Sequence, residues 1–571
     1  MKKALFIIVL LVTQALQAQQ LYVNNSNGTF LTFDTKETAS ITFDEQQQLV
    51  KITSLGNTLS QRFSSQFATV KVESISTVAD KNNELTYNHS PVVEFSSNDN
   101  TSYNEVIDEI ITDDGIDESG DFVENYTTSR IITITFSENG VKTSTLPTGI
   151  TATIDGGHIV INSTLSKTGY QIMGTCSNGS LKIYSDKKFR LLFNNINLTN
   201  PNGPAINIQS GKTVYASIVN KSTNTLCDGA TYNAPAVDSN GEEEDQKGTL
   251  FSEGQLIFDG YTNGTGTLNV TSHGGHAICS DDYIRVRGGN INILSAAKDG
   301  FRTKDKFIIG RTGTYSPKIT INATSNGIEC TEGAFFMNAG MLDIVSGGEG
   351  IKVVYDEPVP DPAIISDATI SGGYISITTT GEKSSAIQTT GNYTQNGGII
   401  QATVNGNGSK IINSDGAVSF IKEDETQTTG KLTAFVYGTL ANDETSAGGI
   451  KCDGALNITD GTIAIACNGQ GAKGINCNND ITIRGGNITL LSTGENYTAI
   501  EDDKKSRAIT AYGITIEGGT VIADAFDHAL SATDFIKIAD GTVNAYSNTT
   551  TALSIEAIQT GGWLLTKDTE E

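Results

Sequence analysis

The feature that most constrains this chain is an internal repeat. The stretch GIKCDGALNITDGTI, from Gly449 to Ile463, returns twenty-five residues later as GINCNNDITIRGGNI, from Gly474 to Ile488. A three-residue unit, any residue followed by Gly or Ala and then an aliphatic residue or Phe, recurs through the second half. One variant has Lys in the middle. The units begin at His276, Asp299, Asn326, Glu349, Ser385, Ser409, Gly448, Lys473, Thr498, His528 and Thr551.

The spacing of this unit predicts the fold class. The short steps are 23 to 25 residues, and the longer steps are that period plus an insertion. A period in the twenties indicates a solenoid in which each unit is one turn. The units contain short alternating runs of Val, Ile and Thr, which predict strands, and Gly pairs, which predict corners. We therefore predict an all-β chain with a parallel β-helix of about twelve coils.

The repeat also predicts an apolar column inside the coils. In register, its members are Ile278, Phe301, Ile328, Ile351, Ile387, Ile450, Ile475 and Ile500. Cys330, Cys452 and Cys477 fall two residues further on, in a slot that Ser280, Thr303, Val353 and Ala532 share. A free thiol in such a slot packs as a small hydrophobe, so core residues are favoured over disulfides, and zinc-type spacing is absent.

The chain divides into four predicted parts. Residues 1–18 have two lysines, an apolar run and small residues, the pattern of a secretory signal peptide. Residues 19–77 form a small β-rich module, residues 78–129 an acidic linker, and residues 130–571 the β-helix. Nine carboxylates lie between 104 and 124. They lack the spacing of an EF-hand loop, which favours a solvated linker over a calcium loop.

The predicted signal peptide indicates the compartment of the protein, and the net charge limits its classes of partner. No cysteine follows the expected cleavage site, and no second apolar stretch approaches ~18 residues. We expect a secreted, periplasmic or cell-surface protein without a transmembrane segment. The net charge is −26, from 38 Lys plus Arg and 64 Asp plus Glu. This charge disfavours nucleic acid and anionic lipid and suits calcium, which prefers oxygen ligands.

Acidic side chains gather near one corner of the first regular coils. Coil stacking brings residues that are distant in sequence within one or two strand spacings of each other. This placement predicts a Ca²⁺ site, and the alternative is a solvated corner of paired charges. The candidate metal ligands are Asp281, Asp282, Asp299, Asp305, Glu329, Glu349 and Asp356.

Basic and aromatic side chains on the segment YIRVRGG are candidates for sugar binding. Arg285 and Arg287 alternate outward beside Tyr283, and Arg302 lies on the next unit. An arginine can hold a carboxylate through two hydrogen bonds, although a structural role on a β-surface is the common alternative. His273 and His276 lie near Asp281, but a pocket and a partner are needed for acid–base work, so we predict no catalytic residue.

Four stretches resemble a known family. Gly203 to Ile206, Asn224 to Tyr232, His276 to Asp282 and Asp299 to Asp305 match, in order, motifs of a bacterial carbohydrate-binding β-helix family whose founding member binds cellulose and pectin. The resemblance covers roughly residues 130–420. It implies a right-handed β-helix like that of pectate lyases, bound calcium, and binding of acidic plant polysaccharide or cellulose without cleavage. Asn326 departs from the pattern by replacing a potential carboxylate ligand.

The expected function is calcium-assisted binding of a polysaccharide, galacturonan or cellulose, by an exported non-catalytic protein. One alternative is a calcium-dependent polysaccharide lyase in which Arg302, Lys304 or Arg285 abstracts a proton. A further alternative is a cell-surface adhesin or structural rod. The sequence selects neither the polysaccharide nor the oligomeric state.

Overall fold

The computed structural model describes residues 120–237, 241–260, 265–311, 316–355, 364–422, 429–500 and 503–548, together with short strands outside these ranges. The chain falls into two compact units, residues 1–94 and 95–571. The predicted signal peptide lies outside the described residues. Within the described part of the chain, no helix has the length and hydrophobicity needed to cross a membrane.

The first unit contains six described strands, all within the predicted β-rich module. β1 (Gln19–Asn25) pairs antiparallel with β2 (Phe30–Asp34) and with β6 (Phe67–Ser74). β3 (Thr38–Asp44) pairs antiparallel with β4 (Leu49–Ser54), which pairs with β5 (Thr58–Arg62). The unit is thus built from two small antiparallel sheets.

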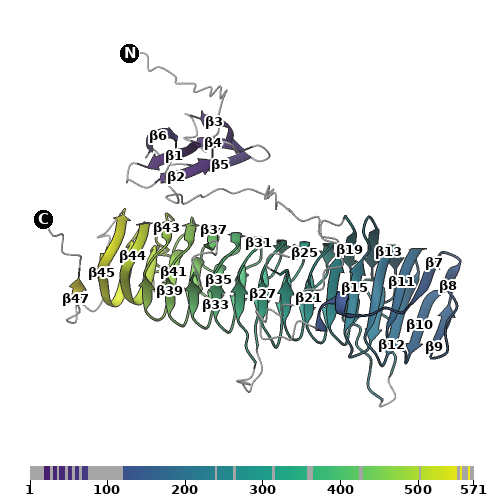
Figure 1. The fold of residues 1–571 in the computed structure, drawn as a ribbon. Coiled ribbons are helices and arrows are strands. Elements are labelled where there is room, and N and C mark those ends of the chain that lie inside the picture. The colour runs from purple at the N-terminus through teal and green to yellow at the C-terminus, as the bar shows by residue number, and fades with distance from the viewer. Residues whose placement is uncertain are drawn as a thin grey trace. The chain divides into compact units, whose positions relative to one another are not determined.

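The second unit is a parallel β-helix, which confirms the predicted fold class. Figure 1 shows its strands stacked coil upon coil, and each coil adds one strand to each of three columns. The first column contains β12 (Gly179–Ser185), β14 (Ile206–Gln209), β17 (Gly248–Ser252), β20 (His276–Ser280), β23 (Phe301–Thr303), β26 (Ile328–Cys330), β29 (Ile351–Val353), β32 (Ile387–Thr389), β35 (Lys410–Ser414), β38 (Gly448–Cys452) and β41 (Lys473–Cys477).

The other two columns follow the same order. The second contains β13 (Phe189–Thr199), β15 (Val214–Ile218), β18 (Leu256–Gly260), β21 (Ile284–Val286), β24 (Phe307–Ile309), β27 (Phe335–Met337), β30 (Ala368–Ile370), β33 (Tyr393–Gln395), β36 (Val418–Phe420), β39 (Leu456–Ile458) and β42 (Ile481–Ile483). The third continues from the end of β13 through β16 (Thr223–Cys227), β19 (Thr267–Ser272), β22 (Asn290–Ala296), β25 (Lys318–Ala323), β28 (Met341–Ser346), β31 (Tyr374–Thr379), β34 (Ile399–Val404), β37 (Lys431–Val436), β40 (Thr462–Cys467) and β43 (Asn487–Ser492).

The two ends of the stack differ from its middle. At the start, β7 (Arg130–Ser137) pairs antiparallel with β8 (Gly140–Thr143), and β9 (Ile150–Asp155) pairs antiparallel with β10 (Gly157–Ser163). β11 (Thr168–Cys176) then lies parallel to β7 and β13. At the other end, β44 (Ile509–Ala525) and β45 (Leu530–Ser547) run as long strands through successive columns, and β46 (Leu553–Ile555) and β47 (Trp563–Leu565) pair with β45.

The inward column is observed with two register corrections. Ile278, Phe301, Ile328, Ile351 and Ile387 stack in order, each at most 1% exposed. The next member is Ile412, which pairs with Ile387 and Ile450, so the predicted variant unit containing Ile411 is one residue out of register. Ile475 pairs with Ile509, so the prediction for Ile500 was wrong. Ile500 lies in an insertion between β43 and β44, where it is half-buried.

The slot of small side chains is confirmed. Ser280, Thr303, Cys330 and Val353 stack in one line, and Cys452 and Cys477 continue it further along. The cysteine side chains in this line are buried, and every described cysteine is a free thiol. The Sγ atoms of Cys452 and Cys477 lie 3.1 Å apart on adjacent coils.

The Gly pairs occupy corners, as the sequence predicted. Gly289, Gly373 and Gly486 each precede a strand of the third column and have φ of +92°, +82° and +82°. L-residues rarely adopt this backbone conformation, whereas glycine adopts it at little cost. The repeated Gly pairs therefore fix the corner between the second and third columns.

Candidate functional site

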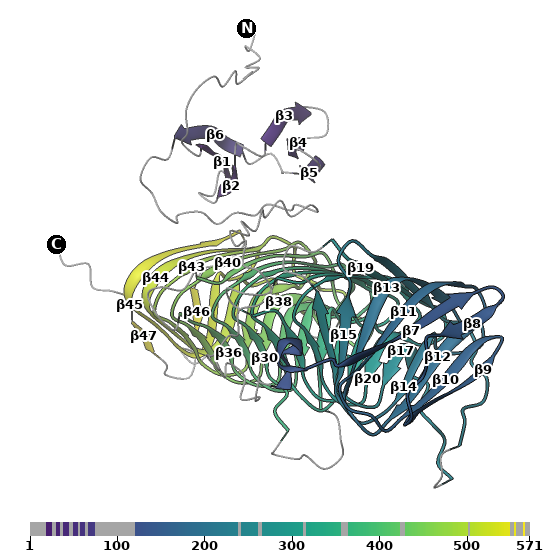
Figure 2. The ribbon, with the colours of Figure 1, turned by 45° about the vertical axis from the view of Figure 1, so that its right-hand side comes forward.

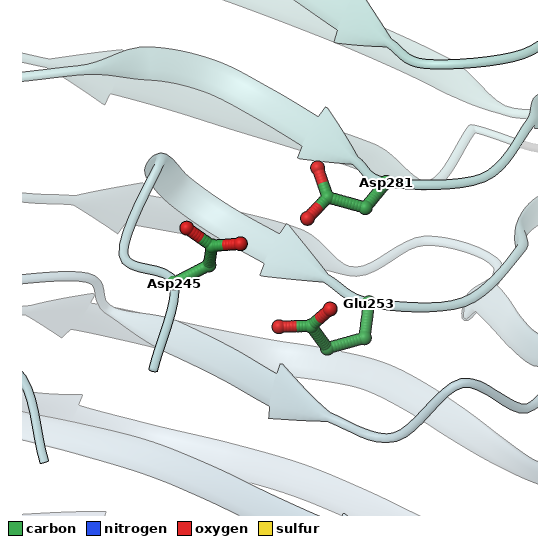
Figure 3. A group of neighbouring side chains, drawn as sticks. All are labelled: Asp245, Glu253 and Asp281. Carbon is green, nitrogen blue, oxygen red and sulfur yellow. The ribbon is translucent and has the colours of Figure 1, made fainter. Parts of the chain in front are cut away.

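Three carboxylates meet at the corner that follows the first column. Figure 3 shows Asp281 just beyond β20, Glu253 just beyond β17 and Asp245 on a neighbouring loop, with their side chains turned toward one another. One oxygen from each carboxylate lies within 4.8 Å of the others. We call these three residues the acidic group. They are half-buried, so solvent reaches the acidic group.

The coil register and one loop position the acidic group. Ser252 of β17 pairs with Ser280 of β20, which places the next residues, Glu253 and Asp281, on adjacent coils. Asp245 comes from the loop between β16 and β17. Its backbone carbonyl accepts hydrogen bonds from Asn207 Nδ2 at 3.2 Å and from Gln209 Nε2 at 3.0 Å. These bonds hold the loop beside the coil corner.

One lysine partly balances the acidic group. Lys247 Nζ lies 2.8 Å from Asp245 Oδ2 and 2.6 Å from Asp281 Oδ2. Burial, followed by the charges of Asp281 and Asp245, raises the pKa of Glu253 to about 7. Burial also raises the pKa of Asp281, although Lys247 opposes that shift. The acidic group is therefore a place where added positive charge is favourable near neutral pH.

The geometry of the acidic group fits a calcium ion. Calcium binds oxygens at about 2.3–2.6 Å, so two ligands on opposite sides of the ion lie about 5 Å apart. The 4.8 Å limit among the three carboxylates is compatible with that spacing. Carboxylate ligands from two coils and a loop can supply several of the 6–8 oxygens that calcium prefers, with water completing the shell. Lys247 occupies the same space and would compete with the ion.

The predicted ligands Asp282 and Asp305 lie outside the acidic group. The Asp282 carboxylate accepts hydrogen bonds from Gln255 Nε2 at 2.6 Å and from its neighbouring amide, that of Tyr283, at 2.9 Å. Burial raises the pKa of Asp305; the charge of Lys306 opposes this shift, and the charges of Asp282 and Glu332 add to it. These acids repel one another along successive coils, but they are not part of the acidic group.

Of the remaining predicted ligands, Asp299 and Glu329 form ion pairs with other residues. Asp299 Oδ2 lies 2.9 Å from His276 Nδ1, and both side chains are buried. Burial opposes ionisation of Asp299, but His276 and the Asn326 amide outweigh it and lower its pKa to about 2. Glu329 pairs with Lys352 at 2.9 Å and Arg302 at 3.3 Å. Burial raises the pKa of Glu349. Asp356 lies outside the described residues.

A segment of the chain packs over the predicted sugar-binding residues Tyr283, Arg285 and Arg287. Residues 120–126, which we call the strap, cross the outer face of the second column near β15 (Figure 2). Arg285 and Arg287 point away from the coil interior as expected, yet each side chain is only 2% exposed. The Tyr283 hydroxyl donates a hydrogen bond to Asp121 of the strap. The Tyr283 side chain packs against an apolar cluster that contains Val123, Tyr126, Tyr215 and Ile257.

Buried ion pairs hold the strap in place. Arg285 Nη1 lies 3.1 Å from Asp121 Oδ2, and Arg287 Nη1 lies 3.0 Å from Glu124 Oε2. The Arg287 guanidinium also stacks over Phe122, 4.1 Å from the ring centre. The strap includes the short 3-10 helix η2 (Val123–Asn125). The sequence placed these residues in a solvated linker, and their carboxylates instead neutralise the two arginines.

Arg302 and Lys304 remain at the surface of the first column. Their side chains are 41% and 53% exposed, and they pair with Glu329 and Glu332. Arg302 is thus the predicted sugar contact that stays accessible. For the lyase alternative, Arg285 is excluded as a proton acceptor because the strap covers it.

Two members of the acidic group were missed in the sequence. The coil before His276 begins Gly248-Thr249-Leu250, and Thr249 breaks the rule of Gly or Ala in the middle. Leu250 nevertheless pairs with Ile278, so extending the register by one coil would have placed Glu253 next to Asp281. No register argument reaches Asp245, because a loop carries it back to the corner.

The chain is similar to a solved structure and matches a family profile. A solved structure described as a polysaccharide lyase-like protein from C. thermocellum, a gadolinium derivative, is similar at 19% sequence identity and a TM-score of 0.37. The match covers 53% of this chain and 99% of that one. No curated protein sequence matches the chain. A family profile described as carbohydrate-binding domain-containing protein matches residues 155–496 and 426–554. The chain therefore belongs to the family of carbohydrate-binding domain-containing proteins.

Proposed function

We propose that this is an exported protein that binds an acidic polysaccharide with the help of calcium and does not cleave it. Family membership supports carbohydrate binding. The observation that carries the calcium part is the acidic group, in which carboxylates of Asp245, Glu253 and Asp281 meet at a solvent-accessible corner. Galacturonan is the first candidate, because its uronate carboxylates are themselves calcium ligands.

Charge gives calcium its role in this proposal. A chain of net charge −26 repels a polyanion, so direct binding of galacturonan needs a bridge. A calcium ion shared between the acidic group and a uronate carboxylate would supply it, because calcium accepts oxygens from several sources. Arg302, which directly follows Phe301 of the ladder and is exposed, lies on the coil next to that of Asp281 and can contact the same polymer.

Retention of the full chain on immobilised polygalacturonate tests the proposal. At physiological salt we expect retention with calcium and release of the protein when a chelator is added. Asp245→Asn with Asp281→Asn should weaken retention in calcium by roughly tenfold or more, because two anionic calcium ligands become neutral amides. Asp155→Asn with Asp186→Asn removes the same charge at two exposed positions and should behave like the parent.

Three outcomes would overturn this function. Retention that persists unchanged in chelator would remove the calcium bridge. Equal retention on uncharged cellulose would remove the acidic ligand. An unsaturated product, seen as rising ultraviolet absorbance during incubation with the polymer, would replace a binding protein with a lyase.

A further inference from the structure

A second candidate site lies toward the other end of the described coils. A cavity of about 250 Å³ opens between the starts of β35, β38 and β41 and two loops that fold over them. Four lysines line it, and we call them the lysine pocket: Lys410, Lys451, Lys473 and Lys504. The loop that precedes β38 contributes Ser446 and its neighbours to the wall.

Coil stacking brings three of the four lysines together. Lys410 pairs with Gly448, which pairs with Lys473, so the two lysines lie two coils apart at the same position of the first column. Lys451 lies between them on β38, with Asn413 and Asn476 beside it in the ladder. Lys504 comes from the insertion between β43 and β44.

The charge of the lysine pocket contrasts with that of the chain. None of the described residues that line the cavity is acidic, whereas the whole chain carries a net charge of −26. Lys451 does contact a carboxylate outside the lining, with Nζ 2.6 Å from Asp453 Oδ1. The described lining thus combines four ammonium groups with no carboxylate, on a chain that is acidic overall.

Lys410 is held at the back of the cavity at an energetic cost. The residue is 9% exposed, and its ammonium donates to the carbonyls of Gly408 at 2.7 Å and Ser446 at 2.5 Å. Burial lowers the pKa of Lys410 to about 8, and the charges of Lys451 and Lys473 add to that shift. A buried ammonium beside two further lysines in the wall of one cavity makes this cavity a candidate site for an anionic group.

We propose that the lysine pocket binds the oxyanion of an acidic sugar residue, a carboxylate or a sulfate ester, without calcium. The proposal rests on the proposed polysaccharide binding and adds a second contact to it. The cavity is smaller than the roughly 300–1,000 Å³ that enclose drug-sized ligands, so it suits one sugar residue of a longer chain. The side chain of Asn476, which also lines the cavity, offers a donor and an acceptor for sugar hydroxyls.

The two sites are placed for one extended polymer. Asp281 follows β20, and the lysine pocket centres on β38, which lies six strands further along the same column. At ~4.8 Å per strand this separation is roughly 30 Å. A polyanion lying along the first column can thus meet calcium near one end and ammonium groups near the other, and two linked weak contacts raise the overall affinity.

Calorimetry with short sugars in chelator isolates the lysine pocket from the calcium site. The probes are trigalacturonate, its methyl ester and a sulfated trisaccharide, each titrated into the full chain at low salt. We expect trigalacturonate or the sulfated sugar to bind and the methyl ester, which lacks the charge, to bind at least roughly tenfold more weakly. Whichever charged sugar binds identifies the oxyanion. Binding by neither, or equal binding of the ester, overturns the proposal.

Matched variants locate the binding. The double variant Lys451→Gln with Lys473→Gln, which we call the pocket variant, should lower the affinity for the charged sugar by roughly tenfold or more, because ammonium–oxyanion hydrogen bonds are lost. Lys318→Gln with Lys431→Gln removes two exposed lysines elsewhere and should match the parent. Lys473→Arg should retain binding. Unchanged affinity in the pocket variant would place the site elsewhere and overturn the proposal.

The two proposals fail in distinguishable ways. If the pocket variant binds short sugars normally while polymer retention still needs calcium, the lysine pocket is not the site and the calcium bridge stands. If the pocket variant loses affinity for short sugars while chelator leaves polymer retention unchanged, the lysine pocket is supported and the calcium bridge is contradicted.

Discussion

Two sets of basic side chains project outward from the β-helix, and they meet different surroundings. Arg285 and Arg287, on the second column, are covered by the strap and paired with Asp121 and Glu124. The lysines of the lysine pocket, on and near the first column, surround a cavity whose described lining has no carboxylate. The first set is covered by the protein itself, and the second lines a cavity.

This difference shows that an outward position on a coil does not define a binding residue. In a solenoid, the ladder fixes which side chains leave the core, but segments outside the ladder decide what covers them. The strap turns two arginines into structural residues. The loops around the lysine pocket form walls instead and leave space between them.

The largest effect is expected when an ion pair between the strap and the covered arginines is removed. Arg285→Met leaves Asp121 buried beneath the strap without that ion pair, which costs roughly 3–5 kcal/mol if the strap stays bound. We therefore expect the strap to detach, and hydrogen exchange at residues 120–126 to accelerate. The double variant Asp121→Asn with Arg285→Met removes both charges and should recover protection. Unchanged exchange in Arg285→Met would show that the pair does not hold the strap.

The sequence could predict the ladder, and only the ladder, with good register. Ile278, Phe301 and Ile328 were placed correctly because their spacing is close to the repeat period. Ile500 was misplaced because an insertion contains a copy of the same short pattern, and short patterns recur by chance in Gly- and Ala-rich loops.

The chemistry was harder to predict, because loops complete each site. Asp281 was identified from its corner position, but Asp245 reaches it through a loop that hydrogen bonds to the previous coils. The strap likewise returns from far away in sequence, with Asp121 164 residues before Arg285. Neither periodicity nor charge patterning reports where such a segment packs.

For the lysine pocket, the corresponding test concerns the lowered pKa of Lys410. Its pKa is about 8 in the fold against 10.5 in the unfolded chain, so between these pH values the unfolded chain binds more protons. The free energy of unfolding of the parent should then rise with pH relative to Lys410→Met, by on the order of 2 kcal/mol between pH 8 and 10.5. Denaturant unfolding across that range measures it, with exposed Lys431→Met as the control. A constant difference would show that burial and the neighbouring lysines do not lower the pKa of Lys410.

The acidic group offers the reverse case, a lysine that occupies a cation site. Lys247 lies within 2.8 Å of both Asp245 and Asp281. Lys247→Met removes this competitor, so calcium should bind roughly tenfold more tightly, as measured by calorimetry. Lys304→Met removes an exposed lysine paired with Glu332 and should leave the affinity unchanged. Weaker calcium binding in Lys247→Met would mean that the ammonium organises the carboxylates instead of competing for them.

The smallest expected effect concerns Glu253. It distinguishes the energetic cost of the Glu253 charge without calcium from the contribution of that charge to calcium binding. The pKa of Glu253 is about 7 in the fold against 4.5 in the unfolded chain, so the folded chain binds more protons between those values. Stability contributed by this group is therefore lost as pH rises from about 4.5 through 7. In chelator at pH 8, Glu253→Gln should be more stable than the parent by less than about 1 kcal/mol, because solvent screens a half-buried group. The advantage should shrink at pH 5. Calcium should reverse the order at pH 8, since binding to the folded state stabilises the parent, which keeps all three carboxylates, more than the variant. Thermal unfolding at both pH values, with and without calcium, measures all four cases, and exposed Glu382→Gln is the control. If calcium raises the melting temperature of the parent and of Glu253→Gln equally, Glu253 is not a ligand.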